Sequence, residues 1–204
     1  MPPASAPVVA SASVNERTRQ RAATRARLLD ASMAEFRRVG VAAAQVEDIV
    51  RAAGVARGTF YLHFPTKDHV LLESVCHDQE PVAARLEALL DRPPRAFLRA
   101  AVDQVIDLAA AEVPAVSREA LIAIARHATD LERERMPIAR ITTEYFRRAQ
   151  ARGEVRRELT PAELVAAFFP GVLGVLLLEP VAAARRLRAR LHQVVDVFVR
   201  GIVS

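Results

Sequence analysis

Residues 45–63 read QVEDIVRAAGVARGTFYLH, and this stretch decides the fold of the N-terminal part of the chain. Two short segments with helical spacing, at about 45–52 and 56–63, lie on either side of Gly54. A sharp reversal between two short helices favours a residue that reaches positive φ at low cost, and glycine is that residue. The stretch therefore predicts a helix-turn-helix.

Apolar and polar positions divide this stretch into a core and a face. A small core locks the second helix across the first, and we expect it to consist of Val46, Ile49, Val50, Val55 and Phe60. The residues left at the front of the second helix are Arg57, Gly58, Thr59, Tyr61 and His63. Side chains at this place in a recognition helix reach into the major groove of DNA.

The segment before the helix-turn-helix is helical and basic. Residues 16–39 show helical periodicity and end at Gly40, while residues 1–14 are rich in Pro, Ala and Ser and predict a disordered arm. Arginines follow one another without an acid between them at Arg17, Arg19, Arg21, Arg25 and Arg27. Such an arm suits DNA phosphates and adds affinity more than specificity, although a solvated helical face explains the same run equally well.

The rest of the composition predicts an all-α protein. Hydrophobic residues make up 51% of the 204 residues and charged residues 26%, with only 7 glycines and no alternating β-branched runs. Prolines punctuate the chain beyond residue 80 and separate helical segments. After a helix at 67–77, we expect helices at about 82–91, 95–112, 115–134, 138–151, 161–178 and 182–202. The capping pattern from Thr160 to Glu163 marks the start of one of them.

Several classes of protein fit the chain poorly. The single cysteine, Cys76, excludes an intramolecular disulfide and predicts a cytoplasmic protein, and no secretory signal is present. The apolar stretch 164–178 is shorter than the ~20 residues of a membrane span, so a buried helix is the better interpretation and no membrane partner is expected. The net charge of +5 is too mild to identify a nucleic-acid binder on its own.

An enzyme or a metalloprotein also fits poorly. The five histidines are scattered, no pair has the spacing of metal ligands, and no glycine-rich phosphate loop occurs. We therefore expect no catalytic residue, no metal and no cofactor. An all-α enzyme that only resembles a helix-turn-helix protein stays open as a remote alternative.

A longer stretch of the chain resembles one family. Residues 27–40 (RLLDASMAEFRRVG) and 48–68 (DIVRAAGVARGTFYLHFPTKD) are similar to the DNA-binding domain of the TetR (tetracycline repressor) family, in the family's order and spacing. The resemblance covers about the first third of the chain. Residues 151–155 (ARGEV), leading into the helix at 161, match the family's C-terminal domain more loosely. The resemblance to the TetR family implies a helix-turn-helix domain at 15–66 and a helical ligand-binding and dimerisation domain at 67–204.

The resemblance also implies roles for individual residues. Tyr61 and His63 would contact phosphates or base edges, and Arg57 and Thr59 would face the groove. Gly58 would let the backbones approach closely. Lys67, at the start of the next helix, would grip a phosphate.

The sequence departs from the family in two respects. Alanine stands at Ala44 and Ala56, where the family usually has Ser or Thr, and loss of such a cap costs about 1 kcal/mol per helix. Gln45 could replace one of the lost phosphate contacts. Leu62 replaces a residue that is often polar or aromatic, which leaves the operator sequence open.

The C-terminal two thirds predict an effector pocket and a dimer interface. The resemblance implies a repressor that binds a palindromic operator as a homodimer and is released by a small apolar or amphipathic effector, whereas a constitutive, ligand-independent DNA-binding protein is the alternative. Residues that could line a pocket are Phe97, Gln104, His127, Asp130, Tyr145 and Phe146. Stripes that face a partner, or the core of the same chain, contain Leu164, Phe168, Gly171, Val175, Leu187, Leu191, Val194 and Phe198.

Overall fold

The computed structural model describes residues 9–127, 135–180 and 183–203, with side chains described from residue 16 onward. The described residues fold into α-helices and connecting loops, so the predicted all-α class is confirmed. The only pairing of β type within these ranges is one isolated bridge between Val155 and Val203. The chain forms two compact units, of which the first ends at Val70 and the second begins at Leu71.

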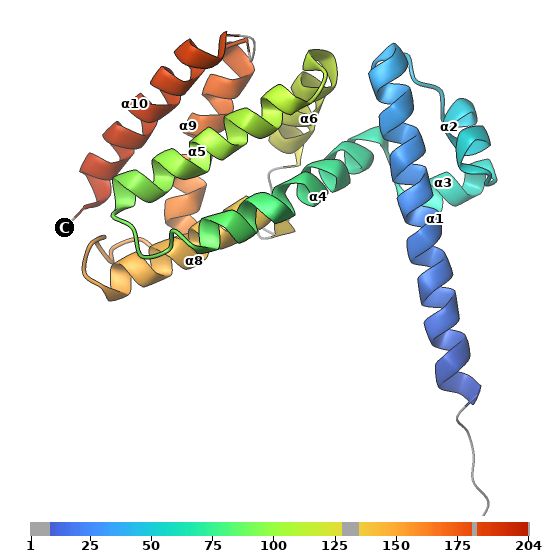
Figure 1. The fold of residues 1–204 in the computed structure, drawn as a ribbon, viewed down its shortest axis with the longest axis horizontal. Coiled ribbons are helices and arrows are strands. Elements are labelled where there is room, and N and C mark those ends of the chain that lie inside the picture. Colours follow the sequence, from blue (N-terminus) through green and yellow to red (C-terminus); the bar gives the residue numbers. More distant parts are fainter. Residues whose placement is uncertain (1–8, 128–134, 181–182, 204) are drawn as a thin grey trace, which may run out of the picture. The chain divides into compact units, whose positions relative to one another are not determined.

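The first unit contains three helices (Figure 1): α1 (Val9–Val39), α2 (Val46–Ala53) and α3 (Arg57–His63). Helix α1 begins before the predicted residue 16, so residues 9–14 are helical rather than part of a disordered arm. The physical reason is that no proline follows Pro7 in this region, and alanine, the best helix former, occurs repeatedly. Residues 1–8 of the predicted arm lie outside the described residues.

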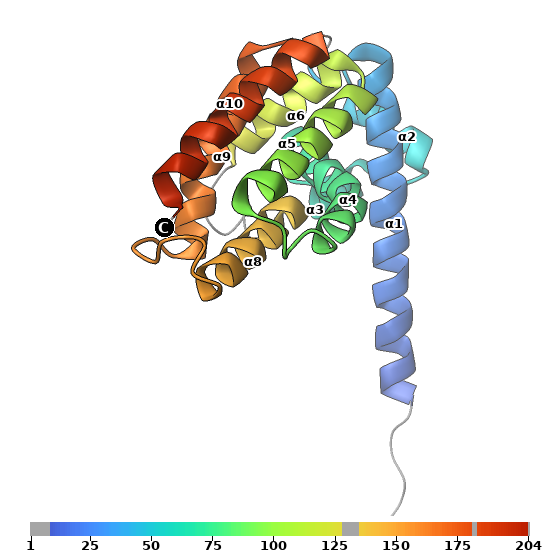
Figure 2. The ribbon, with the colours of Figure 1, turned by 60° about the vertical axis from the view of Figure 1, so that its left-hand side comes forward.

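The second unit is a bundle of longer helices (Figures 1 and 2). Four of its helices carry proline at the first helical position, where the missing N–H costs nothing. The prolines at these positions therefore do separate helices, as the sequence predicts. The helices are α4 (Lys67–Glu87), α5 (Pro94–Ala111), α6 (Pro114–Arg126), α8 (Pro137–Ala151), α9 (Pro161–Leu178) and α10 (Ala184–Ile202).

Helix α4 is one continuous helix where the sequence predicts two. It runs through Pro81, although an interior proline removes a hydrogen bond and costs ~3 kcal/mol in an unsupported helix. The ring of Pro81 is exposed, and Val82, Ala83 and Leu86 directly after it are buried in the core. Burial of this apolar face offsets the local cost of the proline.

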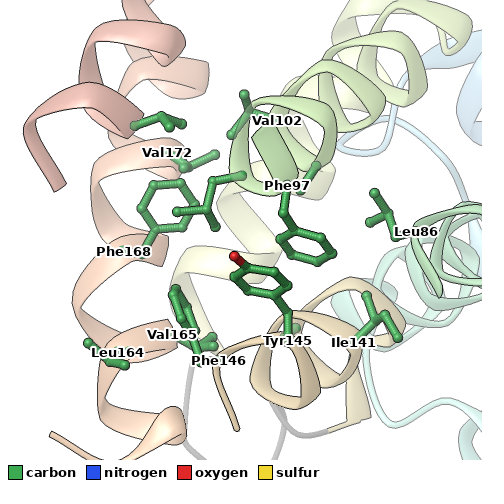
Figure 3. Close-up of a cluster of buried hydrophobic side chains, with 14 of the residues drawn as sticks. Leu86, Phe97, Val102, Ile141, Tyr145, Phe146, Leu164, Val165, Phe168 and Val172 are labelled. Carbon is green, nitrogen blue, oxygen red and sulfur yellow. The ribbon is translucent and has the colours of Figure 1, made fainter. Parts of the chain in front are cut away.

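The core of the second unit forms where α5 and α10 lie side by side and where α9 packs against α6, α8 and α10. At its centre the rings of Phe97 on α5 and Tyr145 on α8 are stacked, with centroids 3.9 Å apart (Figure 3). The Tyr145 hydroxyl donates a hydrogen bond of 3.1 Å to the Arg92 carbonyl. Phe146 lies against Tyr145 edge to face, with centroids 5.7 Å apart.

Helix α9 is apolar along its whole length but is only partly covered. By length and composition it is the one described helix that could cross a membrane, and 33% of it is buried inside the chain. It begins with the predicted capping box, in which Thr160 and Glu163 each bond the backbone N–H of the other. Phe169, Leu173, Val175 and Leu177 are partly buried against the core, whereas Leu178 at the end of the helix is 83% exposed.

Candidate DNA-binding face and ligand cavity

The corner of the helix-turn-helix is built around Gly54, as the sequence predicts. Gly54 has φ 66° and ψ 41°, the left-handed conformation in which glycine is favoured. Its N–H donates to the Arg51 carbonyl, and the N–H of Val55 donates to the Val50 carbonyl at 3.0 Å. These two bonds satisfy carbonyls at the end of α2 and fix the direction in which the chain enters α3.

A small apolar core holds α3 against α1 and α2. Phe60 and Phe64 are fully buried, and their rings lie 6.0 Å apart. Ile49 of α2 and Phe36 of α1 are fully buried as well. Of the five core residues expected from the sequence, four are buried and Val55 is half-buried.

The opposite side of α3 carries an exposed face. Tyr61 is 43% exposed and Leu62 70% exposed, which is unusual for large apolar side chains. Arg57 pairs with Glu47 of α2, and its guanidinium carbon lies 5.9 Å from the centre of the Tyr61 ring. Gly58 is exposed and Thr59 half-buried. The exposed face of α3 therefore presents the guanidinium of Arg57 and the ring of Tyr61 together to solvent.

Neither short helix has a side-chain cap. Ala56 stands at the N-cap of α3, and Gln45 at the N-cap of α2 bonds the Ala43 carbonyl instead of a helix N–H. Ala44 is buried, so this position has a packing role. Backbone N–H groups at both helix starts thus lack a side-chain acceptor, a situation that favours binding of anions such as phosphate.

The expected place of His63 at the exposed front of α3 needs correction. Its side chain is only 7% exposed, because it lies on the same side of the helix as Phe60 and Phe64. Burial and the nearby positive charges of Arg21 and Arg25 lower the pKa of His63. Its Nδ1 atom has no partner among the described residues. His63 is therefore mainly a core residue of the first unit.

Lys67 also makes contacts other than the expected one with a DNA phosphate. Its Nζ donates to the carbonyls of Val41 and Ala42, at 2.7 and 3.3 Å. These carbonyls belong to the loop that joins α1 to α2. Lys67 thus fastens this loop to the start of α4, and any phosphate would compete with two existing bonds.

Arg25 is the positioning residue that the sequence did not reveal. It stands in the basic run of α1, but its Nη1 donates to the His63 carbonyl at 2.6 Å. Its guanidinium also lies 4.4 Å from the centre of the Phe64 ring, within the range of a cation–π contact. Arg25 thus holds the C-terminal end of α3 on α1. No local pattern distinguishes it from its exposed neighbours, since the contact spans 38 residues.

The second unit contains a cavity of about 80 Å³ between α4, α5, α6, α8 and α9. Its lining is almost entirely apolar. The described residues around it are Gln79, Ala101, Val102, Val105, Leu121, Ile124, Met136, Ile138, Ala139, Thr142, Val165, Phe168, Phe169, Val172, Leu173 and Leu176.

None of the five described residues among those predicted for a pocket lines this cavity. Phe97, Tyr145 and Phe146 fill the neighbouring core, because their rings pack on one another. Gln104 accepts hydrogen bonds from Arg85, at 2.7 and 3.0 Å, and His127 ends α6. Asp130 lies outside the described residues.

The predicted dimer residues divide into two groups. Leu164, Leu187 and Leu191 are fully buried within their own chain, so their stripe faces the core. The other five predicted residues border a groove of about 480 Å³ between α9 and α10, and they are Phe168, Gly171, Val175, Val194 and Phe198. Val197, in the same groove, is 71% exposed. The residues around this groove are Ala167, Phe168, Gly171, Val175, Arg190, Gln193, Val194, Val197 and Phe198.

Residues 28–74 match the model of the bacterial regulatory proteins of the tetR family. The match covers the second part of α1, the whole helix-turn-helix and the first turns of α4. Residues 28–74 thus form an N-terminal domain of the TetR type. No curated protein sequence matches it.

Solved structures of TetR-family proteins share this fold over most of the chain. FadR of Thermus thermophilus, a TetR-family repressor solved with lauroyl-CoA, is 21% identical, with a TM-score of 0.75 over 87% of this chain and 94% of that one. A regulator of this family from Mesorhizobium loti is 18% identical, with a TM-score of 0.60 over 90% and 98%. SmeT, the repressor of a Stenotrophomonas maltophilia multidrug efflux pump, is 25% identical, with a TM-score of 0.56 over 88% and 90%.

The contacts of Arg25 generate a testable prediction. Arg25→Met should lower the free energy of unfolding of the first unit by about 1–3 kcal/mol, because a charged hydrogen bond to a partly buried carbonyl is lost. Arg27→Met is the matched control, since Arg27 is exposed and bonds only Thr24 among the contacts described. Its effect should stay within about 0.5 kcal/mol. Urea unfolding followed by circular dichroism measures both, and equal stabilities would contradict the role given to Arg25.

Proposed function

We propose that the chain is a one-component transcriptional repressor that binds a palindromic DNA operator as a homodimer and is released by a small-molecule effector. The observation that carries this proposal is the exposed face of α3. Tyr61 and Leu62 point outward from a helix whose other side is fully buried, within the segment that matches the TetR family. A soluble domain has little reason to expose two large apolar side chains on one short helix unless they contact a partner.

In this proposal α3 enters the major groove. Arg57, Thr59 and Tyr61 contact base edges or phosphates, and Gly58 allows close approach of the backbone. Gln45 and the free N–H groups at the start of α2 contact a phosphate. His63 and Lys67 act mainly by positioning α3 and the loop before α2.

The basic part of α1 adds affinity. Arg17, Arg19 and Arg21 are exposed on the helix that precedes the recognition unit. Cationic side chains near the DNA backbone release counterions and therefore strengthen binding in a salt-dependent way without selecting a sequence. Helix α1 presents these charges in a fixed order.

Dimerisation through α9 and α10 is supported by their uncovered apolar surface. Leu178 of α9 is 83% exposed, and Val197 of α10 is 71% exposed and borders the groove. Two copies of this helix pair, related by a two-fold axis, would form a four-helix bundle that buries both faces. A dimer also places two recognition helices on two half-sites, as a palindromic operator requires.

Release by an effector is supported by the cavity in the second unit and by one relative. SmeT is a repressor, and it has also been solved in complex with triclosan, at 26% identity and a TM-score of 0.54 over 89% of this chain and 92% of that one. An effector acts only if it prefers the arrangement that does not bind DNA. A preference of ~1–3 kcal/mol weakens DNA binding about 5- to 150-fold.

A constitutive DNA-binding protein is the second candidate. The small size of the cavity favours it, since about 80 Å³ is well below the ~300–1,000 Å³ of pockets for drug-sized ligands. The two candidates differ in one property. Only the regulated repressor loses DNA affinity when a molecule occupies the cavity.

The exposed face of α3 predicts the effect of Tyr61→Ala. DNA sites selected from a random-sequence pool by the wild-type protein should be inverted repeats. Tyr61→Ala should bind them about 10-fold or more weakly, because the exposed Tyr61 side chain loses a contact with DNA worth about 1.4 kcal/mol. Leu159→Ala, at an exposed apolar residue of the second unit, is the control and should bind normally. A mobility-shift titration measures the affinities. Equal binding by the two variants would argue against the assigned face.

The groove between α9 and α10 predicts the effect of Val197→Glu. A carboxylate at this exposed position would have to be desolvated in the interface, so the variant should sediment as a monomer at concentrations at which the wild type is a dimer. Val113→Glu, at an exposed residue of α6's N-cap, is the matched control and should remain dimeric. Sedimentation velocity measures the state of each protein. A dimeric Val197→Glu variant would place the interface elsewhere.

A further inference from the structure

The lining of the cavity restricts the charge of any molecule that enters it. Fourteen of the sixteen described lining residues have apolar side chains, and the two polar ones, Gln79 and Thr142, are uncharged. Transfer of an ionised group from water into such surroundings is costly without a partner of opposite charge. The described lining therefore favours an uncharged molecule and disfavours a carboxylate or an ammonium ion.

Both polar residues of the lining bond the backbone of Ile138. The N–H of Ile138 donates to Gln79 Oε1 at 3.2 Å, and the Thr142 hydroxyl donates to the Ile138 carbonyl at 2.7 Å. The hydroxyl proton of Thr142 is thus already used. A backbone N–H can only donate, so the oxygen of the Gln79 amide must face Ile138 and the nitrogen must point elsewhere.

The amide nitrogen of Gln79 is the remaining donor of this lining. Its Nε2 carries two hydrogens, and the hydrogen bond described for this side chain uses only Oε1. A polar group in a largely apolar site contributes orientation and specificity when a ligand satisfies it. A carbonyl or ether oxygen on the ligand would do so, whereas a ligand with only donors would not.

We propose that Gln79 recognises the effector, and that the effector is an uncharged, mainly apolar molecule whose hydrogen-bond acceptor receives the Gln79 Nε2–H. This inference rests on the proposed function and names the ligand class of the same site. The cavity is several times larger than the ~10–15 Å³ that one water needs, so a molecule of about one ring is of suitable size. The flexible thioether of Met136 in the lining can adapt to its shape.

Gln79 also lies where a bound molecule acts on two helices. It belongs to α4, and its Oε1 accepts from an N–H in the first turn of α8, whose N-cap residue Met136 provides no side-chain cap. The amide thus caps α8 from a different helix. An acceptor that draws the Gln79 amide toward the cavity strains or breaks this cap, so ligand binding is felt at α4 and at the start of α8.

Three probes of similar size separate the parts of this proposal. Acetophenone is neutral and carries a carbonyl acceptor, ethylbenzene is neutral without an acceptor, and benzoate is an anion. Binding to the full-length protein is measured by isothermal titration calorimetry. For the wild type, acetophenone should bind about 3- to 10-fold more tightly than ethylbenzene, the gain expected for one hydrogen bond, and at least about 10-fold more tightly than benzoate.

Two variants test the amide itself. Gln79→Leu removes the donor, and Gln79→Glu keeps an oxygen for the Ile138 N–H but removes the donating nitrogen. In both, the preference for acetophenone over ethylbenzene should fall to within about 2-fold. The ratio of the two affinities is the readout because general damage to the cavity affects both probes. Gln104→Leu, on the side of α5 that meets Arg85 and outside the cavity lining, is the control and should keep the preference.

The outcomes distinguish this proposal from the proposed function. An unchanged probe ratio in both Gln79 variants, tight binding of benzoate, or no binding of any probe to the wild type would each overturn the assigned ligand class. DNA titration with saturating acetophenone is a separate arm. If acetophenone binds through Gln79 and DNA affinity stays constant, the recognition by Gln79 stands and release by an effector fails.

Discussion

The recognition helix cannot hold itself in place, and its attachment to α1 is the constraint on which the first unit depends. Helix α3 has seven residues, whereas isolated helices shorter than ~12–15 residues are marginal in water. Its stability therefore comes from tertiary contacts, namely the buried rings of Phe60 and Phe64 and the bond from Arg25 to its last carbonyl. The exposed face with Tyr61 keeps a defined direction because the opposite face is anchored.

A second constraint is the continuity of α4. Lys67 at its start fastens the loop before α2, and Gln79 three turns later lies at the cavity and caps α8. One continuous helix thus carries Lys67 of the first unit at its start and Gln79 of the cavity lining further along. Packing of the residues after Pro81 keeps it helical. Helix α4 is therefore the chain segment that joins the two units.

The sequence predicts local features better than long-range ones. The corner at Gly54, the core of the helix-turn-helix and the capping box at Thr160 follow from spacing within a few residues, and the structure contains them. The cavity does not follow in this way, because Phe97 and Tyr145 could line a space or fill it until their partners are known. Periodicity likewise cannot separate Leu191, which faces its own core, from Val197, which faces outward. The division of apolar and polar positions placed His63 on the exposed face, because histidine is polar, although its side chain is buried. The resemblance gave Lys67 a phosphate contact, because the bonds of Lys67 to Val41 and Ala42 join residues more than 20 positions apart.

The central claim is that two copies of this chain read one symmetric DNA site through their α3 helices. Sedimentation equilibrium of the protein with a duplex that holds one selected site measures the stoichiometry directly. The predicted result is two chains per duplex, bound to two half-sites whose centres are ~34–36 Å apart. One chain per duplex, or equal occupancy of a duplex in which one half-site is scrambled, would contradict the account.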